Sequence, residues 1–126
     1  MSVTEVKEDR KYTKNHEWIA AEGKVGITAF AVDALGDITL VDLTIKAGDS
    51  VKAGDTFGTI ESVKTLSDLF APVSGKVLAV NAALEEKPEL INEDCWGAGW
   101  MLQIEGTDGD LMDAAAYSKF LADSDH

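Results

Sequence analysis

The chain has 126 residues, of which 45% are hydrophobic and 27% are charged, a composition typical of a globular protein. A chain of this length fits one compact domain that buries roughly two-thirds of its unfolded surface. The net charge is −12, whereas phosphate backbones and anionic lipids are bound by clustered lysine and arginine. We therefore expect no nucleic acid and no membrane among the partners.

Residues 1–12 carry no targeting signal that we can identify. They mix acidic and basic side chains, without the apolar core of a signal peptide or the acid-poor, arginine-rich character of a transit peptide. No apolar run approaches the ~20 residues that cross a bilayer. This pattern predicts a cytoplasmic, bacterial-type protein, or a mitochondrial matrix protein if a transit peptide has been removed.

Cys95 is the only cysteine, so the chain has no internal disulfide and no CxxC pair. A lone cysteine is most often a small buried hydrophobic residue, and nothing in the local sequence arranges a histidine to activate it. His16-Glu17 supplies only half of a HExxH motif. We expect neither a nucleophilic cysteine nor a metal site.

The first third of the chain alternates between short strands and one helix. Residues 12–28 predict two strands joined by a turn at Glu22-Gly23. Residues 28–37 predict a helix with Thr28 as its N-cap and Gly36 as its end. Residues 37–45 predict a strand with one face made of Ile38, Leu40 and Asp42 and the other made of Thr39, Val41 and Leu43.

A small internal repeat follows, KAGDSV at 46–51 and then KAGDTF at 52–57. Each unit offers a Gly-Asp turn and then an apolar strand residue. Turns six residues apart predict very short strands that reverse direction quickly. Residues 56–63, 66–73 and 75–81 predict three further strands, the last of them beginning at a turn at Gly75.

The C-terminal third adds helices to the strands. Residues 82–92 predict a short helical turn that Pro88 ends, and residues 100–105 predict a strand. Residues from about 108 to 122 predict an amphipathic helix with Met112, Ala116 and Phe120 on its apolar face and acidic residues in its first turn.

Many short strands with tight turns and peripheral helices indicate a mainly β fold, an antiparallel sandwich or partly closed barrel. We expect a single domain over residues 1–126, with its core in about 11–105. The expected core residues are Val41, Val51, Phe57, Ile60, Val73, Val77, Val80, Trp100, Leu102 and Ile104, with Trp18, Trp96 and Phe70 as further candidates.

Lys64 lies between two predicted strands, where a solvated turn lysine is the ordinary interpretation. A catalytic amine must be neutral near pH 7, and the acidic neighbours Glu61 and Asp68 favour the charged form instead. A lysine that another enzyme acylates needs no such neutral state, because that enzyme supplies the deprotonation. Amide formation would also remove the charge and leave a long arm.

The stretch GDTFGTIESVKTLSDLFAPVSGKV, a strand, an exposed tip and a second strand, resembles the lipoyl and biotinyl carrier domains. Biotin carriers flank their lysine with methionines, whereas Lys64 is flanked by Val63 and Thr65. Glu61, three residues before the lysine, is similar to the lipoyl branch. The segments KYTKNHEW, VGITAFAVDALGDITLVDL, ESVKTLSD, APVSGKVLAVN, PELIN and GWMLQI occur in the order found in the glycine cleavage system H-protein family.

This resemblance runs from about Lys11 to Leu121 and has some departures. Family members usually have proline near Thr44, a Pro-Tyr-like pair near Cys95-Trp96, and often alanine at Thr65. The lysine and the glutamate of the ESVK motif are both present. The departures therefore bear on loop details and leave the attachment motif intact.

The resemblance implies a flattened barrel-sandwich hybrid that acts as a carrier and not as an enzyme. Lipoate would be amide-linked to Lys64 by a lipoate ligase or octanoyltransferase, with Glu61 and Ser62 in the same motif. The carrier would take an aminomethyl group from a pyridoxal-phosphate glycine decarboxylase to a tetrahydrofolate-dependent aminomethyltransferase. A dihydrolipoyl dehydrogenase that uses FAD and NAD would then reoxidise the dithiol.

An aminomethyl group on sulfur is labile to water and carries a cationic amine, so we expect the protein to shelter it beside carboxylates. Glu17 and Asp68 are the acids that we expect to do this, with Asn15 as a hydrogen-bonding neighbour. Two alternatives stay open. The chain could relay lipoyl groups to other lipoyl-dependent enzymes, or it could be an unmodified β-rich interaction module in which Lys64 is only a turn residue.

Overall fold

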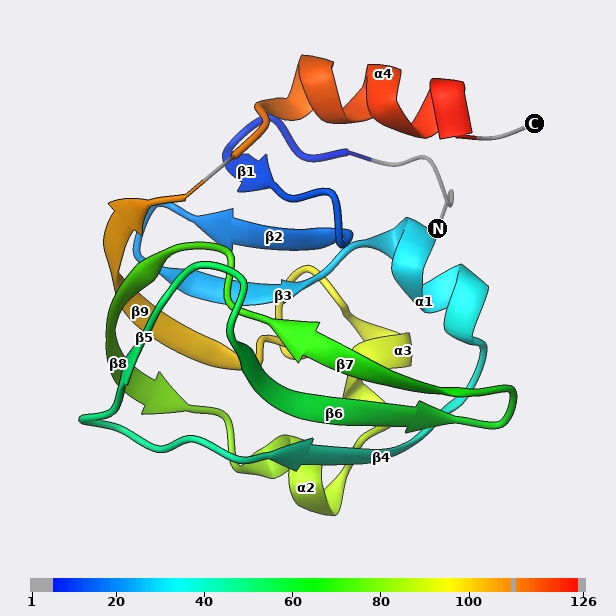
Figure 1. The fold of residues 1–126 in the computed structure, drawn as a ribbon. Coiled ribbons are helices and arrows are strands. Elements are labelled where there is room, and N and C mark those ends of the chain that lie inside the picture. Colours follow the sequence, from blue (N-terminus) through cyan, green and yellow to red (C-terminus); the bar gives the residue numbers. More distant parts are fainter. Residues whose placement is uncertain (1–5, 110, 125–126) are drawn as a thin grey trace.

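Two antiparallel sheets pack face to face in the computed structural model, which describes residues 6–109 and 111–124 (Figure 1). The larger sheet has the order β1 (Arg10–Tyr12), β2 (Glu17–Ala20), β3 (Lys24–Ile27), β9 (Leu102–Asp108), β8 (Ser74–Val80) and β5 (Ser50–Val51). The smaller sheet has the order β4 (Ile38–Leu43), β6 (Thr56–Ser62) and β7 (Leu66–Phe70). The predicted mainly β, flattened sandwich is confirmed, and in the described parts of the chain the sheets do not join into a closed barrel.

Helix α1 (Ala29–Leu35) begins and ends where the sequence predicts. The Thr28 hydroxyl accepts a hydrogen bond from the Ala31 N–H at 3.3 Å, which satisfies one of the free donors at the start of the helix. Gly36 follows with φ of 80°, a backbone conformation that favours glycine. The two caps confine α1 to the link between the two sheets.

The internal repeat builds the same turn twice. Asp49 and Asp55 each accept a hydrogen bond at 2.9 Å from the backbone N–H three residues earlier, and Gly48 and Gly54 take φ values of 99° and 92°. The first turn leads into β5, which pairs with β8 in the larger sheet. The second leads into β6, which pairs with β7 in the smaller sheet. Consecutive repeat units thus start strands in opposite layers.

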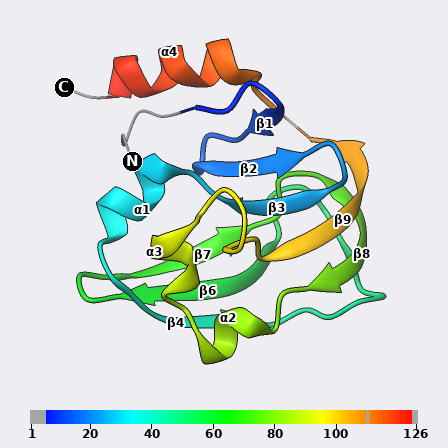
Figure 2. The ribbon, with the colours of Figure 1, turned by 180° about the vertical axis from the view of Figure 1, so that it is seen from behind.

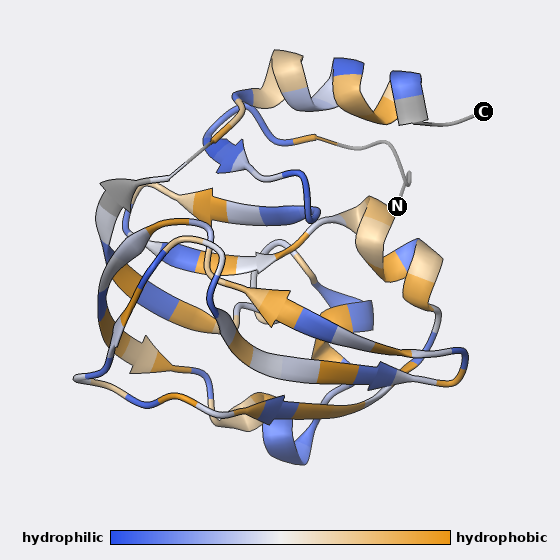
Figure 3. Ribbon diagram, viewed as in Figure 1, coloured by the Kyte–Doolittle hydropathy of each residue, from blue (hydrophilic) through white to orange (hydrophobic). Residues whose placement is uncertain are grey.

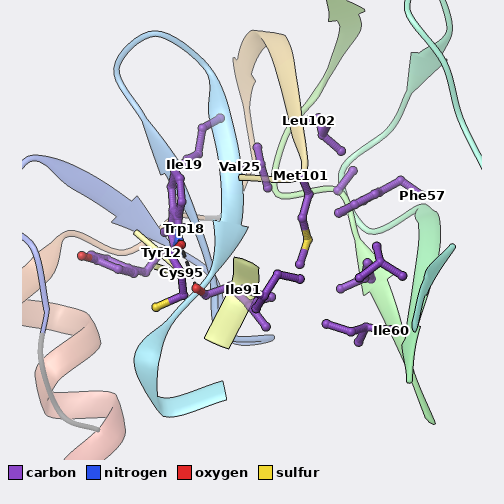
Figure 4. Packing of buried hydrophobic residues seen from close by; sticks show 14 of the residues in the cluster. Tyr12, Trp18, Ile19, Val25, Phe57, Ile60, Ile91, Cys95, Met101 and Leu102 are labelled. Atoms are coloured by element: carbon purple, nitrogen blue, oxygen red, sulfur yellow. Dashed lines mark hydrogen bonds between the residues drawn. The ribbon is translucent and has the colours of Figure 1, made fainter. Parts of the chain in front are cut away.

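The core lies between the sheets, where Phe57 and Ile60 face Ile91 and Met101 (Figure 4). Eight of the ten residues expected there are buried, as are Trp18 and Trp96. Val80, Trp100 and Phe70 are only partly buried: Val80 and Phe70 end their strands, and Trp100 lies outside the strands, before β9. Cys95 is buried as predicted, and its carbonyl accepts a hydrogen bond from the Trp18 indole at 3.0 Å.

The faces predicted for β4 are confirmed from Leu40 to Leu43, where Val41 and Leu43 point inward, but are wrong for Ile38 and Thr39. Ile38 and Val41 are both buried, whereas Leu40 is 48% exposed. The pairing of β4 with β6 shifts register between Ile38 and Leu40. Such a bulge inserts one residue and reverses the alternation that follows it, so the strict period of two that we assumed does not hold.

Two one-turn helices, α2 (Ala83–Glu86) and α3 (Leu90–Glu93), lie together on the side of the sandwich seen in Figure 2. The sequence predicts the first but not the second, because we took Pro88 only as a helix end. Proline fits equally well just before a helix. Leu84 of α2 and Ile91 of α3 are fully buried, so both helices close the core on this side.

The C-terminal helix α4 (Ala114–Ser124) starts later than the predicted 108. Strand β9 instead extends as far as Asp108, and Met112 forms a bridge with Tyr12 before the helix begins. Hydrophilic and hydrophobic residues are interleaved along α4 (Figure 3), but its buried side chains are Tyr117 and Leu121. Of the predicted apolar face, Phe120 and Met112 pack partly buried against the core, although Met112 lies before the helix, and Ala116 is exposed.

No helix within the described residues has the length and the apolar character needed to cross a membrane. The longest of the helices in the described ranges, α4, has 11 residues, and crossing a bilayer takes about 20.

Opposite faces of the smaller sheet should respond very differently to truncation. Ile60 on the inner face is 1% exposed and Leu66 on the outer face is 63% exposed. We expect Ile60→Ala to lower the free energy of unfolding by about 2–5 kcal/mol, and Leu66→Ala to change it by less than about 0.5 kcal/mol. Urea denaturation measures both, and equal losses would contradict the packing described here.

Candidate functional site

Lys64 is exposed at the tip of the β6–β7 hairpin, which projects from the smaller sheet (Figure 1). Ser62 ties the tip together, because its N–H donates to the Thr65 carbonyl at 2.8 Å. The Ser62 hydroxyl also accepts hydrogen bonds from the backbone N–H groups of Lys64 and Thr65, both at 3.2 Å. The backbone under the lysine is therefore fixed by its own turn.

The tip also rests on the segment between α1 and β4. The Val63 N–H donates to the Asp37 carbonyl at 3.0 Å. A Cβ atom on Gly36 would lie 3.3 Å from the Lys64 Cε atom, so the aliphatic part of Lys64 passes close to this glycine. Within residues 6–109 and 111–124, the Lys64 ammonium has no hydrogen bond and no ion pair.

A pocket of about 370 Å³ lies beside the hairpin, between α1, β7 and the loop that precedes β2. Three of the predicted site residues, Asn15, Glu17 and Asp68, line it together. The remaining wall is largely apolar and includes Phe30, Ala31, Ala34, Leu35, Ile60 and Phe70. Glu61 and Ser62 lie at the end of β6 and do not line the pocket.

Glu17 is the buried acid of the pocket, with only 2% of its surface exposed. Its carboxyl accepts hydrogen bonds from the Phe70 N–H at 2.7 Å and from the Thr13 hydroxyl at 3.2 Å. Burial raises the pKa of Glu17 to about 8, against the opposing effect of these two hydrogen bonds. Burial therefore favours the protonated form of this carboxyl, a tendency that the sequence alone did not indicate.

Asp68 and Asn15 form the exposed side of the pocket. Asp68 lies on β7 opposite Thr59, so the carboxylate is carried by a paired strand. The Asn15 N–H donates to the Thr13 hydroxyl at 3.2 Å, the same hydroxyl that contacts Glu17. The pocket thus combines one buried acid, whose pKa is raised, with one acid open to solvent.

Glu61 is exposed on the outer face of the smaller sheet, opposite Leu40 on one side and Leu66 on the other. This places the glutamate of the ESVK motif on the surface around the hairpin tip.

His16 also lines the pocket, and we considered it only as half of a zinc motif. Its ring packs against Phe30 and Phe120, with centroids 4.6 and 5.7 Å away, and its Nδ1 atom lies 2.8 Å from the Tyr117 hydroxyl. The contact links residues 101 positions apart, so no local pattern could have revealed it. The described residues hold no group of three or more His, Cys, Asp or Glu side chains that could bind a metal ion.

A second pocket, of about 500 Å³, lies away from these residues. Ile19, Val73 and Ile104 are among the residues that line it, together with charged groups of residues 8–11. None of the predicted site residues contributes to this lining. This pocket is the larger of the two, but the predicted site residues line the smaller one.

Residues 10–124 match the sequence profile of the family described as "Glycine cleavage H-protein". The glycine cleavage system H protein of Koribacter versatilis is 53% identical over 119 residues, which cover 91% of this chain and 93% of that protein. The one from Bacteroides thetaiotaomicron is 52% identical over 114 residues, covering 85% and 90%. The crystal structure of the Mycobacterium marinum protein of this name superposes with a TM-score of 0.84 at 42% identity, covering 93% of this chain and 99% of that one.

The raised pKa of Glu17 should make stability depend on pH. The folded protein keeps a proton that the unfolded chain releases above about 4.5, so stability falls as pH rises from about 4.5 to about 8 and then levels off. Glu17→Gln keeps the shape and cannot ionise. We expect this substitution to abolish the fall in the free energy of unfolding across that pH range, which is on the order of a few kcal/mol in the wild type. Urea denaturation at several pH values measures it.

The matched control is Glu61→Gln, which changes an exposed glutamate on β6. It should leave the pH profile of the wild type unchanged. Parallel profiles for Glu17→Gln and the wild type between pH 5 and 8 would show that Glu17 is not buried as a protonated acid.

Proposed function

Because the chain belongs to the glycine cleavage H-protein family, whose members are lipoate-bearing carriers, we propose that Lys64 is the residue to which lipoate is amide-linked. The chain is a lipoyl carrier of the glycine cleavage system. The observation that carries the Lys64 assignment is its exposed ammonium at the tip of a hairpin fixed by Ser62. We propose further that residues 1–126 act as one carrier domain, with its chemistry supplied by partner enzymes.

The residues around Lys64 fit such a group. The aliphatic side chain lies along Gly36, where the lack of a Cβ atom leaves room for the base of an arm. Asp68 follows Lys64 by four residues on the adjoining strand, roughly 13 Å away at the usual rise of a β-strand. An extended lysine side chain with the acyl chain of lipoate can cover this distance. The pocket therefore lies within reach of the hairpin tip.

When bound, lipoate supplies a disulfide that accepts the aminomethyl group of decarboxylated glycine on one sulfur and is left as a dithiol once that group has passed on. The chain's own residues would hold the cationic amine at the end of the arm. Asp68 offers a carboxylate at the mouth of the pocket, and Asn15 offers an amide beside it. The apolar wall around Phe30 and Ala34 would exclude water from the labile carbon–sulfur bond.

Glu17 would respond to the arrival of the amine. A cation placed beside a buried carboxyl favours its ionised form, so the pKa of Glu17 would fall from about 8 and its proton would leave. A carboxylate formed in a buried site interacts more strongly with the amine than a solvated one does. The protonated form is thus favoured while the pocket is empty, and a bound cation would shift Glu17 toward its charged form.

The partners that we propose are glycine decarboxylase with pyridoxal phosphate, aminomethyltransferase with tetrahydrofolate, and dihydrolipoyl dehydrogenase with FAD and NAD. A lipoate ligase or an octanoyltransferase would act first, with Glu61 beside the hairpin tip as part of what it contacts. A net charge of −12 favours basic surfaces on all of them. We expect these encounters in the cytoplasm.

The comparisons do not favour the alternative of a lipoyl relay to other enzymes, because the matched relatives share the glycine cleavage name over most of the chain. An unmodified interaction module is likewise the weaker reading of a chain in this family.

Lipoate attachment is tested by intact mass after expression with a lipoate ligase and lipoate. We expect one lipoyl mass gain in the wild type and none in Lys64→Arg. Lys76→Arg is the matched control, since Lys76 is an exposed lysine on β8 away from the hairpin, and it should be modified like the wild type. A gain that survives Lys64→Arg would rule out Lys64 as the attachment residue.

Shelter in the pocket is tested by loading the lipoylated protein with glycine and glycine decarboxylase, removing the enzyme, and timing hydrolysis of the load. Asp68→Asn and Glu17→Gln should each shorten its lifetime, by about 10-fold if one charge-assisted hydrogen bond is lost.

Asp42→Asn provides the control for that experiment. Asp42 is exposed in the same sheet and lies across Thr59 from Asp68, but it does not line the pocket. Its substitution removes the same charge and should leave the lifetime unchanged. Equal lifetimes for the wild type and both pocket variants would exclude a sheltering role.

A further inference from the structure

The hydroxyl of Tyr117 lies between two walls of the 370 Å³ pocket, although Tyr117 itself is on the C-terminal helix. Its oxygen is 2.8 Å from the Nδ1 atom of His16 and 2.8 Å from the Thr28 hydroxyl. His16 belongs to the loop that forms one wall, and Thr28 caps α1, which forms another. Tyr117 and Thr28 are both fully buried, so water cannot replace these hydrogen bonds.

The direction of the two hydrogen bonds follows from the need to satisfy each buried proton. The Thr28 oxygen already accepts from the Ala31 N–H. If Thr28 donates to Tyr117 and Tyr117 donates to His16, every hydroxyl proton has an acceptor. In the reverse direction, the Thr28 proton would have no acceptor within residues 6–109 and 111–124. The first arrangement leaves the Nδ1 atom of His16 without a proton.

The backbone and the ring of His16 are both constrained. Its φ is 64°, a left-handed conformation that is uncommon outside glycine. Phe30 of α1 and Phe120 of α4 contact its ring. Burial lowers the pKa of His16 from 6.5, so the ring is neutral at physiological pH and carries one proton, which the Tyr117 bond leaves on Nε2.

We propose that Tyr117 is a positioning residue for the pocket. Its hydroxyl holds His16 as the neutral Nε2–H tautomer and joins the loop and the start of α1 to the C-terminal helix. His16 is followed directly by Glu17, and Thr28 directly precedes α1, so one hydroxyl fixes the backbone on two sides of the space where the arm would rest. The helix α4 then acts on the pocket without lining it.

Tyr117→Phe isolates the hydroxyl, because the ring keeps its stacking on Tyr12, with centroids 4.5 Å apart and planes 7° from parallel. Tyr12→Phe is the matched control. It also removes a buried hydroxyl, which bonds the backbone N–H and carbonyl of Lys7 at 2.7 and 2.6 Å, and Tyr12 does not line the pocket.

The first measurement needs no loaded arm. Two-bond ¹H–¹⁵N NMR spectra of the wild type at pH 7.5 should show His16 with its proton on Nε2 alone, and Tyr117→Phe should show a mixture of tautomers. Tyr12→Phe should keep the wild-type pattern. A wild-type His16 with its proton on Nδ1 would overturn the inference, whether or not any variant folds.

The second measurement rests on the proposed function. The lifetime of the aminomethyl load should be roughly 2- to 10-fold shorter in Tyr117→Phe than in Tyr12→Phe, the range expected for one net hydrogen bond. Equal lifetimes in the two variants, with a wild-type load that outlasts free aminomethyl-lipoamide, would contradict the role of Tyr117. A wild-type load no longer-lived than the free compound would instead contradict the shelter itself, and the tautomer would still test the hydrogen-bond direction.

Discussion

The carboxyl of Glu17 is the contact on which the site depends, because it joins the two sheets at the point where the pocket forms. Glu17 begins β2 in the larger sheet, and its carboxyl accepts the N–H of Phe70, the last residue of β7 in the smaller sheet. A backbone donor at a strand edge must find an acceptor when it is buried. Here the acceptor is the carboxyl of Glu17. This one group connects the two sheets and also gives the pocket an acid whose ionised form a bound cation would favour.

The two units of the internal repeat begin strands of very different length. Both KAGD units make the same turn, but the first leads into two strand residues and the second into seven. The longer strand continues to Ser62, whose hydrogen bonds fix the turn that presents Lys64. A similar local signal in the two units therefore gives a short strand in one layer and an extended arm-bearing hairpin in the other.

Local chemistry made much of this architecture predictable. Thr28 and Gly36 carry their own capping signals, and the Gly-Asp pairs carry their own turns. The attachment lysine is indicated by resemblance, and the pairing of Glu17 with Asp68 by the charge and lability of the expected load, neither of them by periodicity. A strict period of two could not predict the bulge after Ile38, which depends on how β4 pairs with β6.

Contacts between distant segments account for the remaining differences. The start of α4 depends on the bridge between Met112 and Tyr12. The buried face of α4 contains Tyr117, whose hydroxyl lies against the His16 ring nitrogen. The burial that raises the pKa of Glu17 likewise involves a distant strand, since its hydrogen bond with Phe70 spans 53 positions. None of these pairs lies within a window that a sequence pattern can cover.

The central claim is that the pocket receives the cationic end of an arm carried by Lys64. It is tested most directly with a stable mimic, made by reducing the lipoylated protein and alkylating the dithiol with bromoethylamine. ¹H–¹⁵N NMR spectra should show shifts at Asn15, Glu17 and Asp68, and much smaller ones when the alkylating group is a neutral ethyl chain. Identical spectra for the two adducts at these residues would contradict the account.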